Sequence, residues 1–194
     1  MKHYFSETQD TVYEPFLIPI VARHLSFEIY SAKSIFSVAS LDIGTSVLLK
    51  YAEVSGKILD LGCGYGVVGI TLLLEDKTRD LTFVDISDRA IKLTQKNLVY
   101  HKLKGTVTKS NVLESVSETF DTILTNPPYN AGRPICVAFI KQSFEKLNVE
   151  GSLQLVCRRR KGGDVLEEEM KKIFGNVSVI GQKSGFRVYK SVKE

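Results

Sequence analysis

Three polar side chains stand where apolar runs of the sequence end, and their types indicate a binding site. Asp60 lies at the end of one run, Asp85 ends a second run 25 residues later, and Asn126 follows a third. The carboxyl ends of parallel strands meet at one edge of a sheet, so the three side chains are expected to lie close together. Two carboxylates and an amide suit a ligand with a cationic group and hydroxyls, and an amine that needs a hydrogen-bond acceptor.

A glycine-rich loop follows the first of these runs. It reads Gly62-Cys63-Gly64-Tyr65-Gly66, and glycines there let a ligand approach the backbone closely. The chain also contains the dinucleotide pattern Gly64-x-Gly66-x-x-Gly69, but its first glycine comes two residues too late, and Asp60 would repel a pyrophosphate. S-adenosylmethionine carries an ammonium group and a sulfonium, so it suits Asp60 better than NAD does. A strand-to-helix turn with no ligand is the remaining alternative.

Two further positions suit the same ligand. Asp85 can accept hydrogen bonds from both hydroxyls of a ribose, in S-adenosylmethionine and in NAD alike. Asn111 follows a short strand predicted over 106–109 and can hydrogen-bond the edge of an adenine. An ordinary turn residue is also consistent with the place of Asn111.

The stretch Asn126-Pro127-Pro128-Tyr129 is rich in acceptors and poor in donors. Two prolines fix the backbone and remove two N–H groups, which leaves the Asn126 side-chain oxygen and the Pro127 carbonyl. A planar amine on adenine, guanine or cytosine has two N–H donors, so two acceptors could hold it and aim its lone pair at a methyl group. Tyr129 could stack on the base. A proline turn with a packed tyrosine is the structural alternative.

From about residue 57 the chain alternates short apolar stretches with helical patterns. Strands are predicted over 57–61, 81–85, 106–109, 119–125, 152–157, 177–180 and 187–190. Helices are predicted over 67–74, from a Ser87 cap to about Tyr100, from Pro134 onwards, and from an Asp164–Glu167 capping box to Phe174. This alternation predicts an α/β fold, with a Rossmann-like, doubly wound and mostly parallel sheet.

The first 56 residues differ from this pattern. They contain two short apolar stretches, at 27–30 and 35–38, and a helix that starts within 41–51. This segment is too short for a good core of its own. We therefore expect a small N-terminal cover segment over 1–56 and one domain over 57–194.

Composition excludes several classes of protein. Of the 194 residues 43% are hydrophobic and 25% are charged, which is typical of a globular domain and not of a disordered or fibrous chain. No apolar run reaches the ~18 residues of a membrane helix, and the N-terminus lacks a signal-peptide pattern. We therefore expect a cytoplasmic protein whose three cysteines are reduced, with no membrane partner.

In this order and spacing, the residues from Asp60 to Gly66, Asp85 and the stretch from Asn126 to Tyr129 resemble class I S-adenosylmethionine-dependent methyltransferases. More narrowly, the chain resembles the small-domain methyltransferases, which include the ribosomal RNA guanine-N2 enzymes. The stretches 34–37 and 41–45 are similar to the segment that leads into that family's domain. The resemblance runs from about residue 5 onwards and implies a seven-stranded sheet whose last strand is antiparallel.

The resemblance also implies roles for individual residues. It places Asp60, Gly62 and Gly64 at the methionine end of the cofactor, Asp85 at the ribose, and the target amine at the Asn-Pro-Pro-Tyr stretch. The predicted catalytic residues are Asn126, Pro127, Pro128 and Tyr129. The predicted S-adenosylmethionine site consists of Thr45, Asp60, Gly62, Cys63, Gly64, Gly66, Asp85, Ile86, Asn111, Val112 and Asn126.

The predicted reaction is methylation of an exocyclic amine of an RNA base, with guanine N2 of ribosomal RNA as the leading target. Bacterial relatives often carry an additional N-terminal domain, so the substrate here can differ. The guanine enzymes commonly have phenylalanine at the position of Tyr129, whereas tyrosine is common in enzymes that act on adenine amines or protein glutamine. Those two targets, and a non-catalytic RNA- or cofactor-binding module, remain alternatives.

A basic run follows the fifth predicted strand and reads Arg158-Arg159-Arg160-Lys161. It is expected on the rim beside Tyr129, where it could contact RNA phosphates, and a solvated turn is the alternative. The net charge of +4 permits a nucleic-acid partner without requiring one. No metal site is expected, because the three histidines show no ligand spacing with each other or with cysteines.

Overall fold

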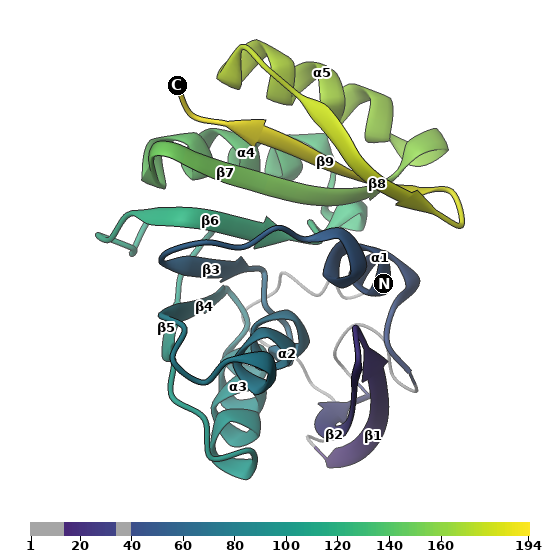
Figure 1. The fold of residues 1–194 in the computed structure, drawn as a ribbon, viewed down its shortest axis with the longest axis vertical. Coiled ribbons are helices and arrows are strands. Elements are labelled where there is room, and N and C mark those ends of the chain that lie inside the picture. Colours follow the sequence, from purple (N-terminus) through teal and green to yellow (C-terminus); the bar gives the residue numbers. More distant parts are fainter. Residues whose placement is uncertain (1–13, 34–39) are drawn as a thin grey trace.

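A seven-stranded sheet forms the centre of the computed structural model, which describes residues 14–33 and 40–194 (Figure 1). Its strands are β3 (Ile58–Leu61), β4 (Leu81–Asp85), β5 (Thr106–Lys109), β6 (Phe120–Thr125), β7 (Leu147–Arg158), β8 (Ser178–Lys183) and β9 (Phe186–Val192). They lie in the order β5-β4-β3-β6-β7-β9-β8. Strands β3 to β7 run parallel, and β9 is antiparallel to both of its neighbours. The predicted Rossmann-like sheet with an antiparallel last strand is confirmed.

Helices cover both faces of the sheet, as the apolar strands require. Every residue of β3 and β4 is buried, which is typical of parallel strands covered on two sides. Three helices share one buried cluster on one face, namely α1 (Ile43–Tyr51), α2 (Val67–Glu75) and α3 (Asp88–Tyr100). Two helices share the cluster on the other face, α4 (Arg133–Lys146) and α5 (Gly163–Phe174). In the described part of the chain, no helix is both long and apolar enough to cross a bilayer.

Helix ends follow the sequence signals with one exception. Ser87 caps α3 by accepting the N–H of Ala90 at 3.4 Å, as predicted. Gly175 ends α5 in the left-handed conformation. The predicted capping box at Asp164 is wrong, because Gly162 is the N-cap residue and Asp164 lies within the first turn. The sharp turn out of β7 needs a φ of 98° at this cap, which a glycine adopts without strain.

Strand β7 is longer than the predicted stretch 152–157. It begins directly after α4, and its register with β6 shifts between Phe120 and Thr122. Glu150 has a φ of 66°, so the strand is kinked before regular pairing resumes at Ser152. The apolar signal therefore marks only the regular part of the strand.

An N-terminal hairpin lies apart from the sheet, beside α2 and α3 (Figure 1). Its strands β1 (Pro15–Ala22) and β2 (Leu25–Ala32) pair antiparallel. The predicted strand at 27–30 lies within β2, but the sequence does not predict β1, because Pro19 interrupts its apolar alternation. The predicted strand at 35–38, and the similar stretch 34–37, lie outside the described residues.

Side chains tie this hairpin to the helices next to the cavity described below. Arg23 donates to two backbone carbonyls at the end of α1 and pairs with Glu75 of α2. Asn97 of α3 accepts the N–H of Tyr30 at 2.8 Å and donates to its carbonyl at 3.0 Å. Helix α1 forms within the predicted range 41–51, and Asp42 is its N-cap residue.

Candidate cofactor and amine-binding site

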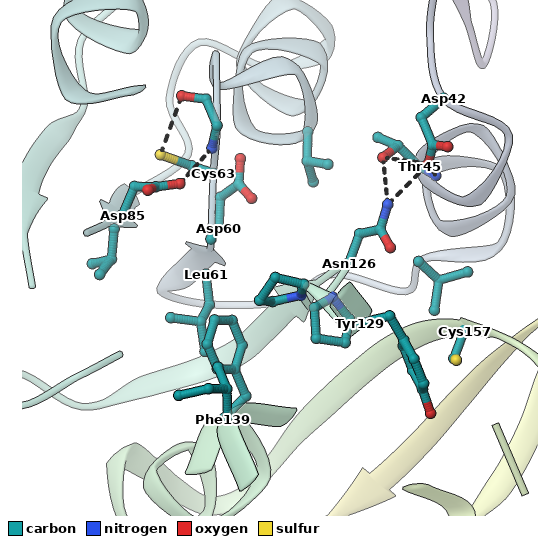
Figure 2. Close-up of a pocket in the computed structure, with 18 of the residues that line it drawn as sticks. Asp42, Thr45, Asp60, Leu61, Cys63, Asp85, Asn126, Tyr129, Phe139 and Cys157 are labelled. Atoms are coloured by element: carbon teal, nitrogen blue, oxygen red, sulfur yellow. Dashed lines mark hydrogen bonds between the residues drawn. The ribbon is translucent and has the colours of Figure 1, made fainter. Parts of the chain in front are cut away.

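A cavity of about 400 Å³ opens at the carboxyl ends of β3, β4 and β6, the edge where open parallel sheets bind ligands. Figure 2 shows Asp60 and Asp85 on one side and Asn126 and Tyr129 on the other. The predicted site residues that line it are Thr45, Asp60, Gly62, Cys63, Gly64, Asp85, Ile86, Asn111, Val112, Asn126, Pro127, Pro128, Tyr129, Arg158 and Lys161. The predicted residues Gly66, Arg159 and Arg160 are not among those that line it.

Left-handed glycines shape the loop between β3 and α2. Gly62, Gly64 and Gly66 have φ values of 72°, 59° and 83°, which residues with a side chain rarely adopt. The Gly62 N–H donates to the Val84 carbonyl at 2.8 Å and ties the loop to β4. A Cβ on Gly66 would lie 3.0 Å from the Thr94 side chain. Gly66 therefore serves packing against α3 and does not line the cavity.

Asp60 is a buried carboxylate at the bottom of the cavity. Its side chain accepts the N–H of Gly69 at 3.0 Å, and the residue is only 3% exposed. Burial raises the pKa of Asp60 to about 7; the Gly69 N–H works against that shift and the charge of Asp85 adds to it. Within residues 14–33 and 40–194, no lysine or arginine pairs with this carboxylate. A bound cation would supply the missing counter-charge.

Asp85 is held by the backbone around it. One of its carboxylate oxygens accepts the N–H of Gly64 and the other that of Ser87, both at 2.9 Å. These two bonds fix the carboxylate against the glycine loop and the start of α3. A carboxylate can accept about four hydrogen bonds, so this residue type suits the hydroxyl groups of a ligand in the cavity.

Asn126 follows β6, and its amide is anchored on α1. The amide nitrogen donates to Asp42 Oδ2 at 2.9 Å and to Thr45 Oγ1 at 3.0 Å (Figure 2). Both N–H groups are thereby used, and the amide oxygen points away from α1. Pro127 and Pro128 also line the cavity, and because neither has an N–H they add no backbone donor to this part of the wall.

Tyr129 begins a short 3-10 helix, η1 (Tyr129–Ala131), on the same side of the cavity. Its ring lies on Gly162, where a Cβ would overlap the phenol. Burial, together with a hydrogen bond to Cys157, raises the pKa of the Tyr129 hydroxyl. The ring is thus half-buried at the rim, with one edge held by β7 and the turn after it.

Several residues of the cavity were not among those predicted. Asp42 could have been found as an aspartate directly before a helical pattern, the usual place of an N-cap. Phe139 and Phe186 also line the cavity, but their sequence patterns indicate only a core position. Asn111 lines it as predicted, and its amide nitrogen donates to Glu114 at 2.7 Å.

The basic run is divided by the structure. Arg158 and Lys161 line the cavity, and the Arg158 guanidinium lies 5.5 Å from the centre of the Phe186 ring. Arg159 instead faces Asp164, at 3.5 Å between Nε and Oδ1. In the described ranges, no group of three or more histidine, cysteine or acidic residues is placed to hold a metal ion.

Comparison with known proteins places these features in a family. The sequence profile of the family "Methyltransferase small domain" matches residues 26–190. The uncharacterized protein YbxB of Bacillus subtilis (strain 168) is 31% identical over 99% of this chain and 98% of its own length. Ribosomal RNA small subunit methyltransferase C of Actinobacillus pleuropneumoniae serotype 7 is 36% identical over 86% of this chain and 52% of its own length. The chain thus spans about half the length of that second relative.

Solved structures share the fold. The T. thermophilus 16S rRNA guanine-N2 methyltransferase RsmC, in complex with AdoMet and guanosine, aligns with a TM-score of 0.80 at 22% identity, over 95% of this chain and 51% of that one. A methyltransferase from Pyrococcus furiosus aligns with a TM-score of 0.66 at 21% identity, over 75% of this chain and 79% of that one. The profile match and the YbxB match each span most of the sequence. With its glycine loop and its Asn-Pro-Pro-Tyr stretch, the chain therefore belongs to the methyltransferase small domain family.

Proposed function

We propose that the chain transfers a methyl group from S-adenosylmethionine to the exocyclic amine of an RNA base, guanine N2 of ribosomal RNA. The observation that carries this proposal is the Asn126 amide, whose nitrogen is engaged by Asp42 and Thr45. Its oxygen is the end of the amide that remains for a ligand. The Asn126 oxygen is an acceptor that suits an amine. The buried Asp60 lies across the cavity from it and suits a cationic cofactor.

The residues of the cavity suit S-adenosylmethionine. Asp60 would pair with the ammonium group, and Asp85 would accept hydrogen bonds from the ribose hydroxyls. The left-handed glycines let the loop backbone approach the ligand. When bound, S-adenosylmethionine supplies an electrophilic methyl group on a positively charged sulfur. Residues 1–56 act in this proposal as a cover over the domain at 57–194, with Thr45 reaching into its cavity.

Asn126 and Pro127 hold the target amine in the proposed mechanism. The Asn126 oxygen and the Pro127 carbonyl accept its two N–H groups, so that its lone pair turns towards the methyl group. The amine nitrogen forms a bond to the methyl carbon while the bond from that carbon to sulfur breaks, and the electron pair of the broken bond goes to sulfur. The two acceptors stabilise the positive charge that builds on the nitrogen, and one proton then leaves to water.

The substrate class rests on the rim and on the named relatives. Arg158 and Lys161 place cations beside the cavity, where RNA phosphates would position the base. Relatives in this family include ribosomal RNA small subunit methyltransferase C, and a solved neighbour of that name was bound to guanosine. Both support guanine in ribosomal RNA as the target, and with it a cytoplasmic place of action.

Mass analysis of nucleosides tests this function. The purified chain is incubated with S-adenosylmethionine and an unmodified small-subunit ribosomal RNA transcript, or with subunits assembled on it. N2-methylguanosine is expected with the wild type and is expected to form far more slowly with Asn126→Ala, which controls for copurified host enzymes. N6-methyladenosine or methylated protein glutamine in its place would replace the guanine assignment. No product, together with no cofactor binding in calorimetry, would favour a non-catalytic module.

A further inference from the structure

Asp42 lies at the cavity, and the chemistry described above does not yet use its charge. It is the N-cap residue of α1 and accepts the Thr45 N–H at 2.9 Å. The same oxygen, Oδ2, accepts the Asn126 Nδ2 at 2.9 Å, although the two residues are 84 positions apart. A helix cap needs only the first of these bonds. The bond to Asn126 is therefore a second feature that capping does not explain.

Thr45 completes the arrangement around the Asn126 amide. Its hydroxyl lies 3.3 Å from Asp42 Oδ2, to which it donates, and it accepts from Asn126 Nδ2 at 3.0 Å. The amide nitrogen thus faces two acceptors, one of them a carboxylate. If the amide were flipped, its oxygen would face the same two acceptors, and the negative charge of Asp42 would oppose it. Of the two orientations, which differ little in shape, Asp42 favours the one observed.

We propose that Asp42 is a positioning residue for methyl transfer, which holds the Asn126 amide with its oxygen towards the substrate amine. This inference rests on the proposed function, because it gives Asp42 a part in the same transfer. A hydrogen bond to a carboxylate is roughly twice as strong as one between neutral groups. It also polarises the amide, so that the amide oxygen becomes a better acceptor. Thr45 alone does not fix the orientation, since a hydroxyl can donate as readily as it accepts.

Serine at position 42 separates this role from helix capping. Serine caps a helix about as well as aspartate does, but its side chain is shorter and uncharged, so the bond from Asn126 to a carboxylate is lost. We expect Asp42→Ser to slow single-turnover methyl transfer about tenfold or more at saturating RNA and cofactor, the cost of one hydrogen bond to a charged group. Asp76→Ser is the matched control, because Asp76 accepts from Thr78 in the turn before β4, at the opposite end of the strands. It should keep the wild-type rate.

A double-mutant cycle shows whether Asp42 acts through Asn126. In the Asn126→Ala background there is no amide left to orient, so adding Asp42→Ser should slow transfer less than about twofold. The inference is overturned if Asp42→Ser slows transfer equally in both backgrounds. It is also overturned if Asp42→Ser alone transfers methyl at the wild-type rate.

The NMR signals of the Asn126 side-chain amide give a readout that does not depend on turnover. They are identified by their loss in Asn126→Ala. Because its nitrogen is engaged on both sides, this amide should exchange with water about tenfold more slowly in the wild type than in Asp42→Ser. Equal exchange would contradict the anchoring. The two results can also separate. If the amide exchanges faster in Asp42→Ser but the wild type does not methylate RNA, the anchoring is supported and only the proposed function is contradicted.

Discussion

The two sides of the cavity are built in different ways. The proposed cofactor side, around Asp60 and Asp85, is held by the backbone of nearby elements, since the Asp85 carboxylate accepts the N–H groups of Gly64 and Ser87, 21 and 2 residues away. The proposed amine side, around Asn126 and Tyr129, is held by side chains from distant segments, since the Asn126 amide is bound by Asp42, 84 residues earlier.

This difference predicts a division of labour between the two sides. A rigid loop whose N–H groups are satisfied is prepared to bind a ligand before it arrives. Acceptors that hold an amine gain strength only as charge builds on its nitrogen during transfer. Substitutions on the cofactor side should therefore change affinity, and substitutions on the amine side should change the rate.

The largest effect on affinity is expected at Asp85. Replacing it in Asp85→Ala removes the proposed acceptor of the ribose hydroxyls and should weaken S-adenosylmethionine binding by about 1.5–3 kcal/mol, the range for hydrogen bonds to a charged group. Calorimetry measures the change in S-adenosylmethionine affinity. Asp85→Asn is the matched variant, because its side chain keeps one acceptor oxygen. The rate at saturating cofactor should change less than about threefold. Wild-type affinity in Asp85→Ala would remove Asp85 from the cofactor site.

Tyr129 should affect both base capture and rate. Stacking is worth about 1–3 kcal/mol per base, so Tyr129→Ala should lower kcat/KM by roughly 5- to 150-fold. Tyr129→Phe should be mild, because it loses only the bond to Cys157 and keeps the ring. An equal loss in the two variants would show that the hydroxyl, and not stacking, matters.

Gly162 offers a way to move this ring without changing it. A Cβ in Gly162→Ala would overlap the Tyr129 phenol and displace it. Gly175→Ala is the control at the other end of α5, with a φ of 79° and nothing within 4 Å of the added Cβ. Both variants should lose about 1–2 kcal/mol of unfolding free energy from the left-handed backbone, but only Gly162→Ala should lose activity. Equal activity losses would mean that the ring position is unimportant.

Cofactor affinity should depend on pH through Asp60. Its pKa in the free protein is raised to about 7 by burial, so below that pH the side chain is neutral and must lose its proton to pair with an ammonium group. Affinity should then fall up to about tenfold for each pH unit below 7 and level off above it. Calorimetry across this range checks the slope. Asp60→Asn should bind S-adenosylmethionine weakly, with an affinity that does not change with pH over this range. The same pH dependence in Asp60→Asn as in the wild type would show that another group titrates.

The smallest effect is expected from the basic rim. Replacing both Arg158 and Lys161 by glutamine should flatten the salt dependence of RNA binding by ~0.7–0.9 log units per lost phosphate contact. The paired substitution of Arg159 and Arg160 tests whether residues that do not line the cavity contribute equally. If neither pair of substitutions changes the salt dependence, residues 158–161 form a solvated turn that does not contact RNA phosphates.

Sequence alone reveals most of the cofactor side. Strands β3 and β4 are short, mostly apolar runs, and the glycines of the loop stand between a strand and a helix, so their positions follow from local pattern. Asp60 and Asp85 are visible there as carboxylates at strand ends. Each of these signals is contained within a few residues.

The amine side is only partly visible in the sequence. The Asn-Pro-Pro-Tyr stretch can be recognised in the sequence. The bond between Asp42 and Asn126 cannot, because it depends on how α1 packs on the sheet. The contact between the Tyr129 ring and Gly162 likewise depends on the turn before α5, where the sequence pattern predicts a capping box at Asp164 instead of a cap at Gly162. Such contacts join segments whose spacing carries no periodic signal, and so they appear only once the chain is folded.

The single-turnover rate of Asn126→Ala tests the central claim most directly. The variant removes the acceptor for the amine and leaves Asp60, Asp85 and the glycine loop in place. With saturating S-adenosylmethionine and ribosomal RNA, we expect transfer to slow by ~10²–10³-fold, comparable to removing one preorganised polar contact from another active site. Calorimetry of the same variant should give cofactor affinity within about threefold of the wild type. Transfer at the wild-type rate would contradict the proposed activation of the amine.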